Sequence, residues 1–210
     1  MLMRHRERAW ECDGQLLLIV GEPGLGKSRL IEEFHGRLRD TPNAWVERSC
    51  SQFLQNTPLH PIAEWGRQRF GSTDVPAERR LADLETSLAQ VKLDPADNTA
   101  LLAPLLDIAL PKERLPSLAA EELRRQQLAA LTNWVMASAK VQPVALAFED
   151  LHWADPTTLD VLRGLAERGA LAPLFSDGAA GVPVAVEHPV ASQYHLARAA
   201  RPLPGTRHGG

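Results

Sequence analysis

The chain has 210 residues and a mass of 23.1 kDa, which is enough for one α/β domain of ordinary size. Hydrophobic residues make up 44% of the sequence and charged residues 23%, a balance that excludes collagen-like, coiled-coil and wholly disordered classes. The longest uninterrupted aliphatic run, Leu16–Val20, is far shorter than the ~20 residues that a membrane-spanning helix needs. We therefore expect no membrane span.

Charge and cysteine usage narrow the class further. The net charge is -3 and the isoelectric point is near 6.2, so we do not expect direct nucleic-acid binding. The two cysteines, Cys12 and Cys50, form no C-x-x-C pair. This spacing argues against a zinc site and is typical of a protein of the reducing cytoplasm. We expect both cysteines to be plain buried thiols.

The first part of the chain has the pattern of a strand, a glycine-rich turn, a helix and a second strand. Residues 15–20 are almost continuously aliphatic, which indicates a strand buried on both faces of a parallel sheet. Residues 28–39 carry apolar side chains at helical spacing, and residues 44–50 form a candidate second strand. This order predicts a βαβ unit.

The middle of the chain is predicted to be a helical insertion. Residues 51–117 are polar and punctuated by prolines, and residues 117–140 form a longer amphipathic stretch that we expect to lie across the sheet. A second buried strand is expected at residues 143–148. Asp155 is then a natural N-cap for a further helix, with Pro156 at its first position.

A phosphate-binding loop lies between the first strand and the first helix. The segment matches G-x-x-x-x-G-K-[ST], in which backbone N–H groups cradle phosphates, the lysine reaches the terminal phosphates and the hydroxyl holds Mg²⁺. Arg29 follows directly and is either a further nucleotide contact or a solvated charge. The candidate nucleotide-binding residues are Gly21, Glu22, Pro23, Gly24, Leu25, Gly26, Lys27, Ser28 and Arg29.

An acidic pair, Glu149 and Asp150, follows the buried strand at residues 143–148. Phosphoryl transfer needs one acidic group near Mg²⁺ and, for hydrolysis, a carboxylate that orients the attacking water. We assign Glu149 with Ser28 to the metal and Asp150 to the water, and the two acidic residues could exchange these catalytic roles. His152 comes next, either as a γ-phosphate sensor or as a packing partner of Trp153.

Three segments together resemble the AAA-type ATPase module of bacterial multidomain signalling proteins, a relative of the Orc1-like and STAND ATPases. They are GEPGLGKSRLIEEF, ERSCSQFLQNTPLHPI and VALAFEDLHWADPTTLDVL. The resemblance covers roughly residues 5–175, places Walker A at residues 21–28 and places Walker B at residues 144–150. It implies a three-layer α/β P-loop NTPase fold, ATP and Mg²⁺ as cofactors, and conditional hydrolysis used as a regulatory switch.

The resemblance also implies partners. Such modules often lie next to a cyclase or DNA-binding output domain and tetratricopeptide-type repeats, and self-association is an option. One alternative is a non-catalytic interaction fragment that keeps the fold without turning over ATP, and another is a DNA-linked Orc1-like loader.

The domain is expected at residues 1–175, shortened at its N-terminus relative to the family. The family continues with a sensor strand between the Walker A and Walker B strands, but this chain has Ser176–Gly181 at that point. We therefore expect an irregular tail at residues 176–210, either native or produced by a frameshift near Phe175, and a sheet without its central strand.

Overall fold

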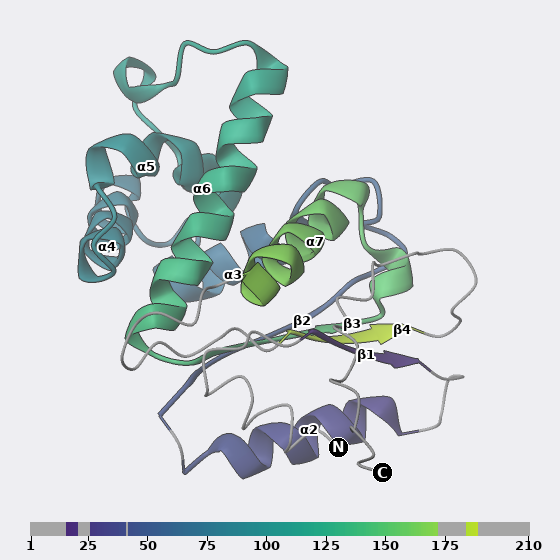
Figure 1. Ribbon diagram of the computed structural model, residues 1–210. Coiled ribbons are helices and arrows are strands. Elements are labelled where there is room, and N and C mark those ends of the chain that lie inside the picture. The colour runs from purple at the N-terminus through teal and green to yellow at the C-terminus, as the bar shows by residue number, and fades with distance from the viewer. Residues whose placement is uncertain (1–15, 21–25, 41, 172–183, 189–210) are drawn as a thin grey trace, which may run out of the picture.

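The computed structural model describes residues 16–20, 26–40, 42–171 and 184–188. These residues form a four-stranded parallel sheet with helices on both faces (Figure 1). This arrangement confirms the expected α/β fold with a helical insertion between the second strand and the Walker B strand. The strand order is β1-β4-β3-β2, with β1 at Leu16–Val20, β2 at Ala44–Ser49, β3 at Val144–Glu149 and β4 at Val184–His188.

The β3 strand is buried on both faces, as its continuously apolar sequence predicts. Val144, Leu146 and Phe148 contact the main hydrophobic core, whereas Ala145 belongs to a second cluster on the opposite face. This alternation follows from the two-residue period of a strand. β2 pairs with β3 in parallel from Ala44 opposite Val144 onward, so the two strands end at the same edge of the sheet.

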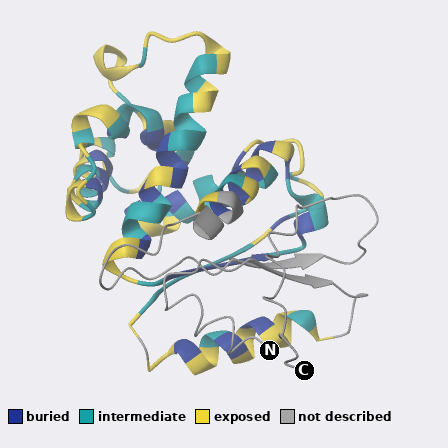
Figure 2. Cartoon of the chain, in the orientation of Figure 1, coloured by how far each residue is buried: buried dark blue, intermediate teal, exposed yellow. Residues whose placement is uncertain are grey.

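One face of the sheet is covered by α2 (Lys27–Leu38). Phe34 and Leu38 of this helix are buried with Ala145 of β3, and Trp45 of β2 packs against the same cluster. Figure 2 shows buried residues of α2 on its side toward the sheet and exposed residues on its outer side. The helix therefore begins at the carboxyl end of β1 and returns along the sheet, as expected of a βαβ unit.

The other face carries the insertion and the helix after β3 (Figure 1). The C-terminal half of α6 packs on the sheet, while its N-terminal half extends outward beside α5, so the expectation that the whole helix crosses the sheet is only partly right. The helices are α3 (His60–Phe70), α4 (Ala77–Gln90), α5 (Pro95–Leu102), α6 (Ala120–Val141) and α7 (Pro156–Leu171), with short 3-10 turns η1 (Ala103–Leu106), η2 (Lys112–Arg114) and η3 (Leu151–Trp153).

The central strand of the sheet comes from the tail, which corrects one expectation. Val184–His188 forms β4, which pairs in parallel with β1 on one side and with β3 on the other. An unpaired strand edge exposes a row of N–H and C=O groups, and β1 and β3 each supply such a row to β4. The expectations of a sheet without a central strand and of a wholly irregular segment from residue 176 onward are therefore wrong at these five positions.

Asp155 caps α7 as predicted. Its Oδ1 atom accepts hydrogen bonds from the backbone N–H groups of Thr157 at 2.9 Å and Thr158 at 3.0 Å. Its Oδ2 atom accepts one from the N–H of Leu59 at 3.1 Å. The same buried carboxylate thus starts α7 and fixes the residue before α3. Within the described parts of the chain, no helix combines the length and apolarity that crossing a membrane requires.

Candidate functional site

The N-terminus of α2 forms one wall of the candidate site. Gly26 has φ +75°, in the left-handed region that glycine adopts without steric cost, and its carbonyl accepts the first helical hydrogen bond from Leu30 at 3.0 Å. Lys27 and Ser28 are the first residues of the helix, and no acidic residue lies in its first turn. The helix start therefore presents a positive partial charge and a lysine, which favour an anion.

Ser28 meets the acidic pair across the sheet. Its hydroxyl donates a hydrogen bond of 2.7 Å to Oε2 of Glu149, which lies 121 positions away in sequence. Ser28 is exposed and Glu149 is half-buried, so the pair faces solvent at the carboxyl edge of the strands. The structure thus brings together the two side chains that the sequence assigns to a metal ion.

Asp150 points to a different neighbour. Its Oδ2 atom lies 3.4 Å from the hydroxyl of Ser49, which donates to it from the end of β2. Asp150 has φ +52°, an uncommon left-handed conformation that aspartate tolerates better than most residues. This conformation ends β3 and begins η3, so Glu149 and Asp150 have different hydrogen-bonding partners although they are adjacent in sequence.

Ser49 was not singled out by the sequence. It is the last residue of β2 and lies in register with Glu149 of β3, so its hydroxyl reaches the acidic pair. A polar residue at the end of a predicted neighbouring strand is the signal that could have identified it, because the carboxyl ends of parallel strands meet at one edge of the sheet.

The remaining candidates occupy simpler settings. His152 packs against Trp153 with ring centroids 4.7 Å apart, and its role toward a phosphate stays a prediction. Arg29 is exposed on α2. The candidates Gly21, Glu22, Pro23, Gly24 and Leu25 lie outside the described residues, as does Cys12.

Cys50 follows β2 directly and is buried, as expected. Burial, together with the nearby carboxylates of Asp155 and Asp150, raises the pKa of its thiol to about 12. Since the thiolate is the reactive form of cysteine, this environment makes Cys50 unreactive. Cys50 is therefore a structural thiol, next in sequence to Ser49 of the candidate site.

The donor set at this edge suits Mg²⁺. A serine hydroxyl and a carboxylate are oxygen ligands of the kind that Mg²⁺ prefers, and Mg²⁺ usually takes only one or two carboxylates together with substrate phosphates. No cluster of three His, Cys, Asp or Glu side chains that could hold a metal ion occurs among the described residues. The residues therefore fit a metal that arrives with a phosphate ligand better than a metal held by the protein alone.

Fold and site together define a P-loop nucleotide-binding module. A family model described as an AAA ATPase domain matches residues 2–176, and the chain belongs to this family. It is also 30% identical over 155 residues to an uncharacterized protein of Rhizobium meliloti (strain 1021), a match that covers 71% of this chain and 14% of that protein. No solved structure matches the chain.

Proposed function

We propose that this module binds ATP with Mg²⁺ and uses the nucleotide as a conformational switch within a signalling or transcription-regulating protein. The observation that carries the proposal is the hydrogen bond between Ser28 and Glu149. It joins the helix start after the phosphate loop to the end of β3, which supports a nucleotide site built from residues of both segments. Membership of the AAA ATPase domain family supports ATP as the nucleotide.

The residues divide the work by chemistry. The backbone N–H groups at the start of α2 and the ammonium of Lys27 would hold the β- and γ-phosphates. The hydroxyl of Ser28 and the carboxylate of Glu149 would hold Mg²⁺, which supplies charge neutralisation to the phosphates when bound. Arg29 lies one residue further along α2, is exposed, and would add a positive charge beside the phosphates.

Hydrolysis would depend on Asp150. Its carboxylate lies beside Ser49 rather than Ser28, so it is available to accept a hydrogen bond from a water molecule and orient that water toward the γ-phosphate. Glu149 and Asp150 could exchange these roles, and the two substitutions described below distinguish the assignments.

The fold also supplies a route from the nucleotide site to the insertion. β3 ends at Glu149 and leads through η3 to Asp155, whose buried carboxylate holds both the start of α7 and the N–H of Leu59 before α3. A displacement of the β3 end would therefore reach two helices. This connection supports a switch, because a bound γ-phosphate would act on the β3 end.

The output of the switch lies beyond this module. The chain spans only 14% of the curated relative it matches, so the activity of a whole protein of that length would belong to other domains. We propose a cyclase or DNA-binding output domain, with self-association as a further option and no direct nucleic-acid binding by this module.

Binding can be tested by isothermal titration of the 210-residue chain with ATP, with and without Mg²⁺. We expect Mg²⁺-dependent binding that weakens at least tenfold in Lys27→Ala and stays unchanged in Lys112→Ala, which removes an exposed lysine of η2. Equal affinity in the two variants, or no saturable binding, would favour the alternative of a non-catalytic interaction fragment.

The roles of the acidic pair can be separated by two conservative substitutions. Glu149→Gln should remove the Mg²⁺ dependence of ATP binding, whereas Asp150→Asn should keep Mg²⁺-dependent binding and abolish phosphate release. The reverse pattern would exchange the two roles. Phosphate release is measured over hours, because the family resemblance implies conditional turnover.

A further inference from the structure

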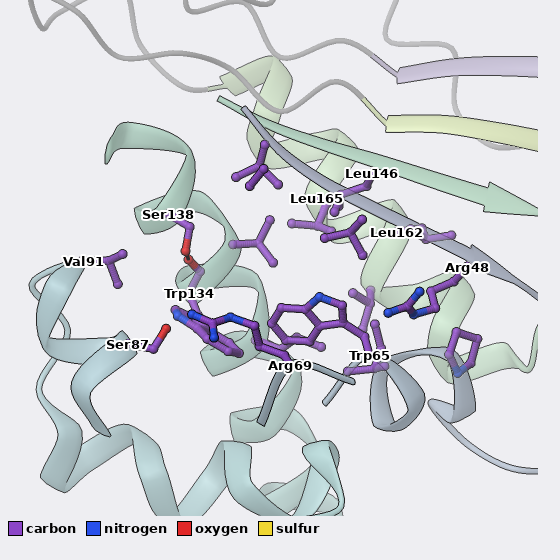
Figure 3. A pocket seen from close by; sticks show the side chains of 18 of the residues that line it. Arg48, Trp65, Arg69, Ser87, Val91, Trp134, Ser138, Leu146, Leu162 and Leu165 are labelled. Atoms are coloured by element: carbon purple, nitrogen blue, oxygen red, sulfur yellow. Dashed lines mark hydrogen bonds between the residues drawn. The ribbon is translucent and has the colours of Figure 1, made fainter. Parts of the chain in front are cut away.

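A cavity of about 280 Å³ lies between the sheet and the helical insertion (Figure 3). We call it the insertion cavity. Its walls come from β2, β3, α3, α4, α6 and α7, and apolar side chains including Val46, Trp65, Trp134, Leu146 and Leu162 line it. Neither Ser28 nor Glu149 is among the lining residues, so the insertion cavity is separate from the candidate nucleotide site.

The charged side chains that line the insertion cavity are of one sign. Arg48 and Arg69 are the lining residues that carry a charge, and no Asp or Glu is among the described residues of the wall. A mostly apolar cavity with a few polar groups is the ordinary form of a small-molecule site. Arg48 is half-buried, whereas Arg69 is exposed and its guanidinium lies over the ring of Phe70. The positive charge of this wall favours a ligand with a negative charge.

Arg48 is poorly paired for a partly buried cation. Its Nη2 atom donates to Oε1 of Gln68 at 2.6 Å and its Nη1 atom donates to the backbone carbonyl of Glu47. Its Nε–H is buried without a hydrogen-bond partner among the described residues. Burial lowers the pKa of Arg48, although the carboxylates of Glu64 and Glu47 act in the opposite direction. Nη1 and Nη2 each carry a second N–H, so the guanidinium can still donate hydrogen bonds to a ligand.

Trp134 contributes an aromatic ring to the wall of the insertion cavity. It is 4% exposed, and its indole N–H is buried without a hydrogen-bond partner in the described structure. Its ring packs against Trp65, with centroids 5.3 Å apart, and against Phe70. Trp134 and Trp65 thus give the insertion cavity an aromatic wall that suits the apolar body of a ligand.

The size of the insertion cavity limits that ligand. At about 30 Å³ of liquid volume per water molecule, 280 Å³ corresponds to roughly nine water molecules. A ligand with on the order of ten non-hydrogen atoms, most of them apolar to match the wall, therefore fits in it.

We propose that the insertion cavity binds a small amphipathic carboxylate, with its carboxylate on Arg48 and its apolar body between Trp65, Trp134 and the side chains of α7. A medium-chain fatty acid is the simplest member of this class. The guanidinium fork suits a carboxylate because it can donate two parallel hydrogen bonds. This binding requires no nucleotide, so the proposal can be tested independently of the proposed ATP site.

Titration of the nucleotide-free 210-residue chain with sodium octanoate tests the proposal, with heat and tryptophan fluorescence as readouts. We expect saturable one-site binding, and binding at least tenfold weaker for 1-octanol and for octylamine, which share the alkyl chain but lack the negative charge. This comparison uses the unmodified protein, so it does not depend on the folding of a variant. Equal binding of octanol and octanoate, or no saturable octanoate binding at all, would overturn the proposal.

Variants then locate the site. Arg48→Gln should weaken octanoate binding at least tenfold, Arg48→Lys should restore part of the loss, and Leu162→Trp should block the cavity. The matched control is Arg163→Gln, which removes an exposed arginine of α7 that pairs with Asp160 outside the cavity. Circular dichroism checks that each variant folds. If folded Arg48→Gln and Arg163→Gln bind octanoate equally, the carboxylate is not held by Arg48 and the proposal is wrong.

Discussion

Replacing Asp155 by alanine should destabilise the fold more than removing an ordinary helix cap. Asp155 is 4% exposed and accepts hydrogen bonds from Thr157 and Thr158 at the start of α7 and from Leu59 before α3. Loss of a cap costs about 1 kcal/mol. Leaving the N–H of buried Leu59 without a partner adds about 1–3 kcal/mol.

The sum is a loss of about 3 kcal/mol in the free energy of unfolding for Asp155→Ala. For a chain of this size, this loss lowers Tm by roughly 6–12 °C. Asp155→Asn keeps one acceptor oxygen for the N–H groups of α7 but turns an NH₂ group toward Leu59. Its free energy of unfolding should therefore lie between those of the unmodified chain and Asp155→Ala. Urea denaturation followed by circular dichroism measures both values.

Asp94→Ala is the matched control. Asp94 caps α5 through one exposed hydrogen bond of 2.8 Å to the N–H of Ala96, so its removal should cost about 0.5–1 kcal/mol. If Asp155→Ala costs no more than Asp94→Ala, the hydrogen bond to Leu59 has no energetic weight. The route proposed from β3 to the insertion would then lose its main support.

Three further predictions concern other parts of the fold. A Cβ atom at Gly66 would lie 2.5 Å from a backbone oxygen of η1, whereas one at Gly36 would meet nothing within 4 Å. In urea denaturation, Gly66→Ala should therefore lower the free energy of unfolding by about 1–3 kcal/mol, whereas Gly36→Ala should leave it unchanged or raise it. In a Cys12→Ser background, alkylation of Cys50 at pH 8 should be far slower in the folded chain than in the urea-unfolded chain. In the folded chain the rate should rise about tenfold per pH unit toward pH 12, because the pKa of Cys50 is raised to about 12. Equal rates in both states would contradict the burial of Cys50. Val186→Pro should lower Tm sharply because proline cannot donate to a central ladder, and an unchanged Tm would mean that β4 is not central.

Much of the fold follows from local patterns in the sequence. Residues 16–20 and 144–148 are continuous apolar runs, a pattern typical of a doubly buried strand, and both lie in strands of the structure. The phosphate-loop motif fixes the start of α2, and the expected cap at Asp155 forms. These features could be predicted because each depends on neighbouring residues in sequence.

The parts that escaped prediction depend on residues distant in sequence. Val184–His188 is short and lies in a stretch rich in glycine, proline and alanine, so its own pattern does not identify a strand; the exposed ladders of β1 and β3 supply the reason for it. The contact of Ser49 with Asp150 and the insertion cavity likewise require the packed sheet. A frameshift near Phe175 stays a prediction, which the nucleotide sequence of the tail would test.

The position of β4 links the stability of the sheet to the geometry of the nucleotide site. β1 leads into the phosphate loop and β3 ends at Glu149, but these two strands are not neighbours in the sheet. Val186 of β4 pairs in register with Leu18 on one side and Phe148 on the other. The 2.7 Å hydrogen bond between Ser28 and Glu149 therefore spans the end of β4. A change in β4 that separates β1 from β3 should weaken Mg²⁺-dependent ATP binding together with folding, whereas a change confined to the insertion should affect the two separately.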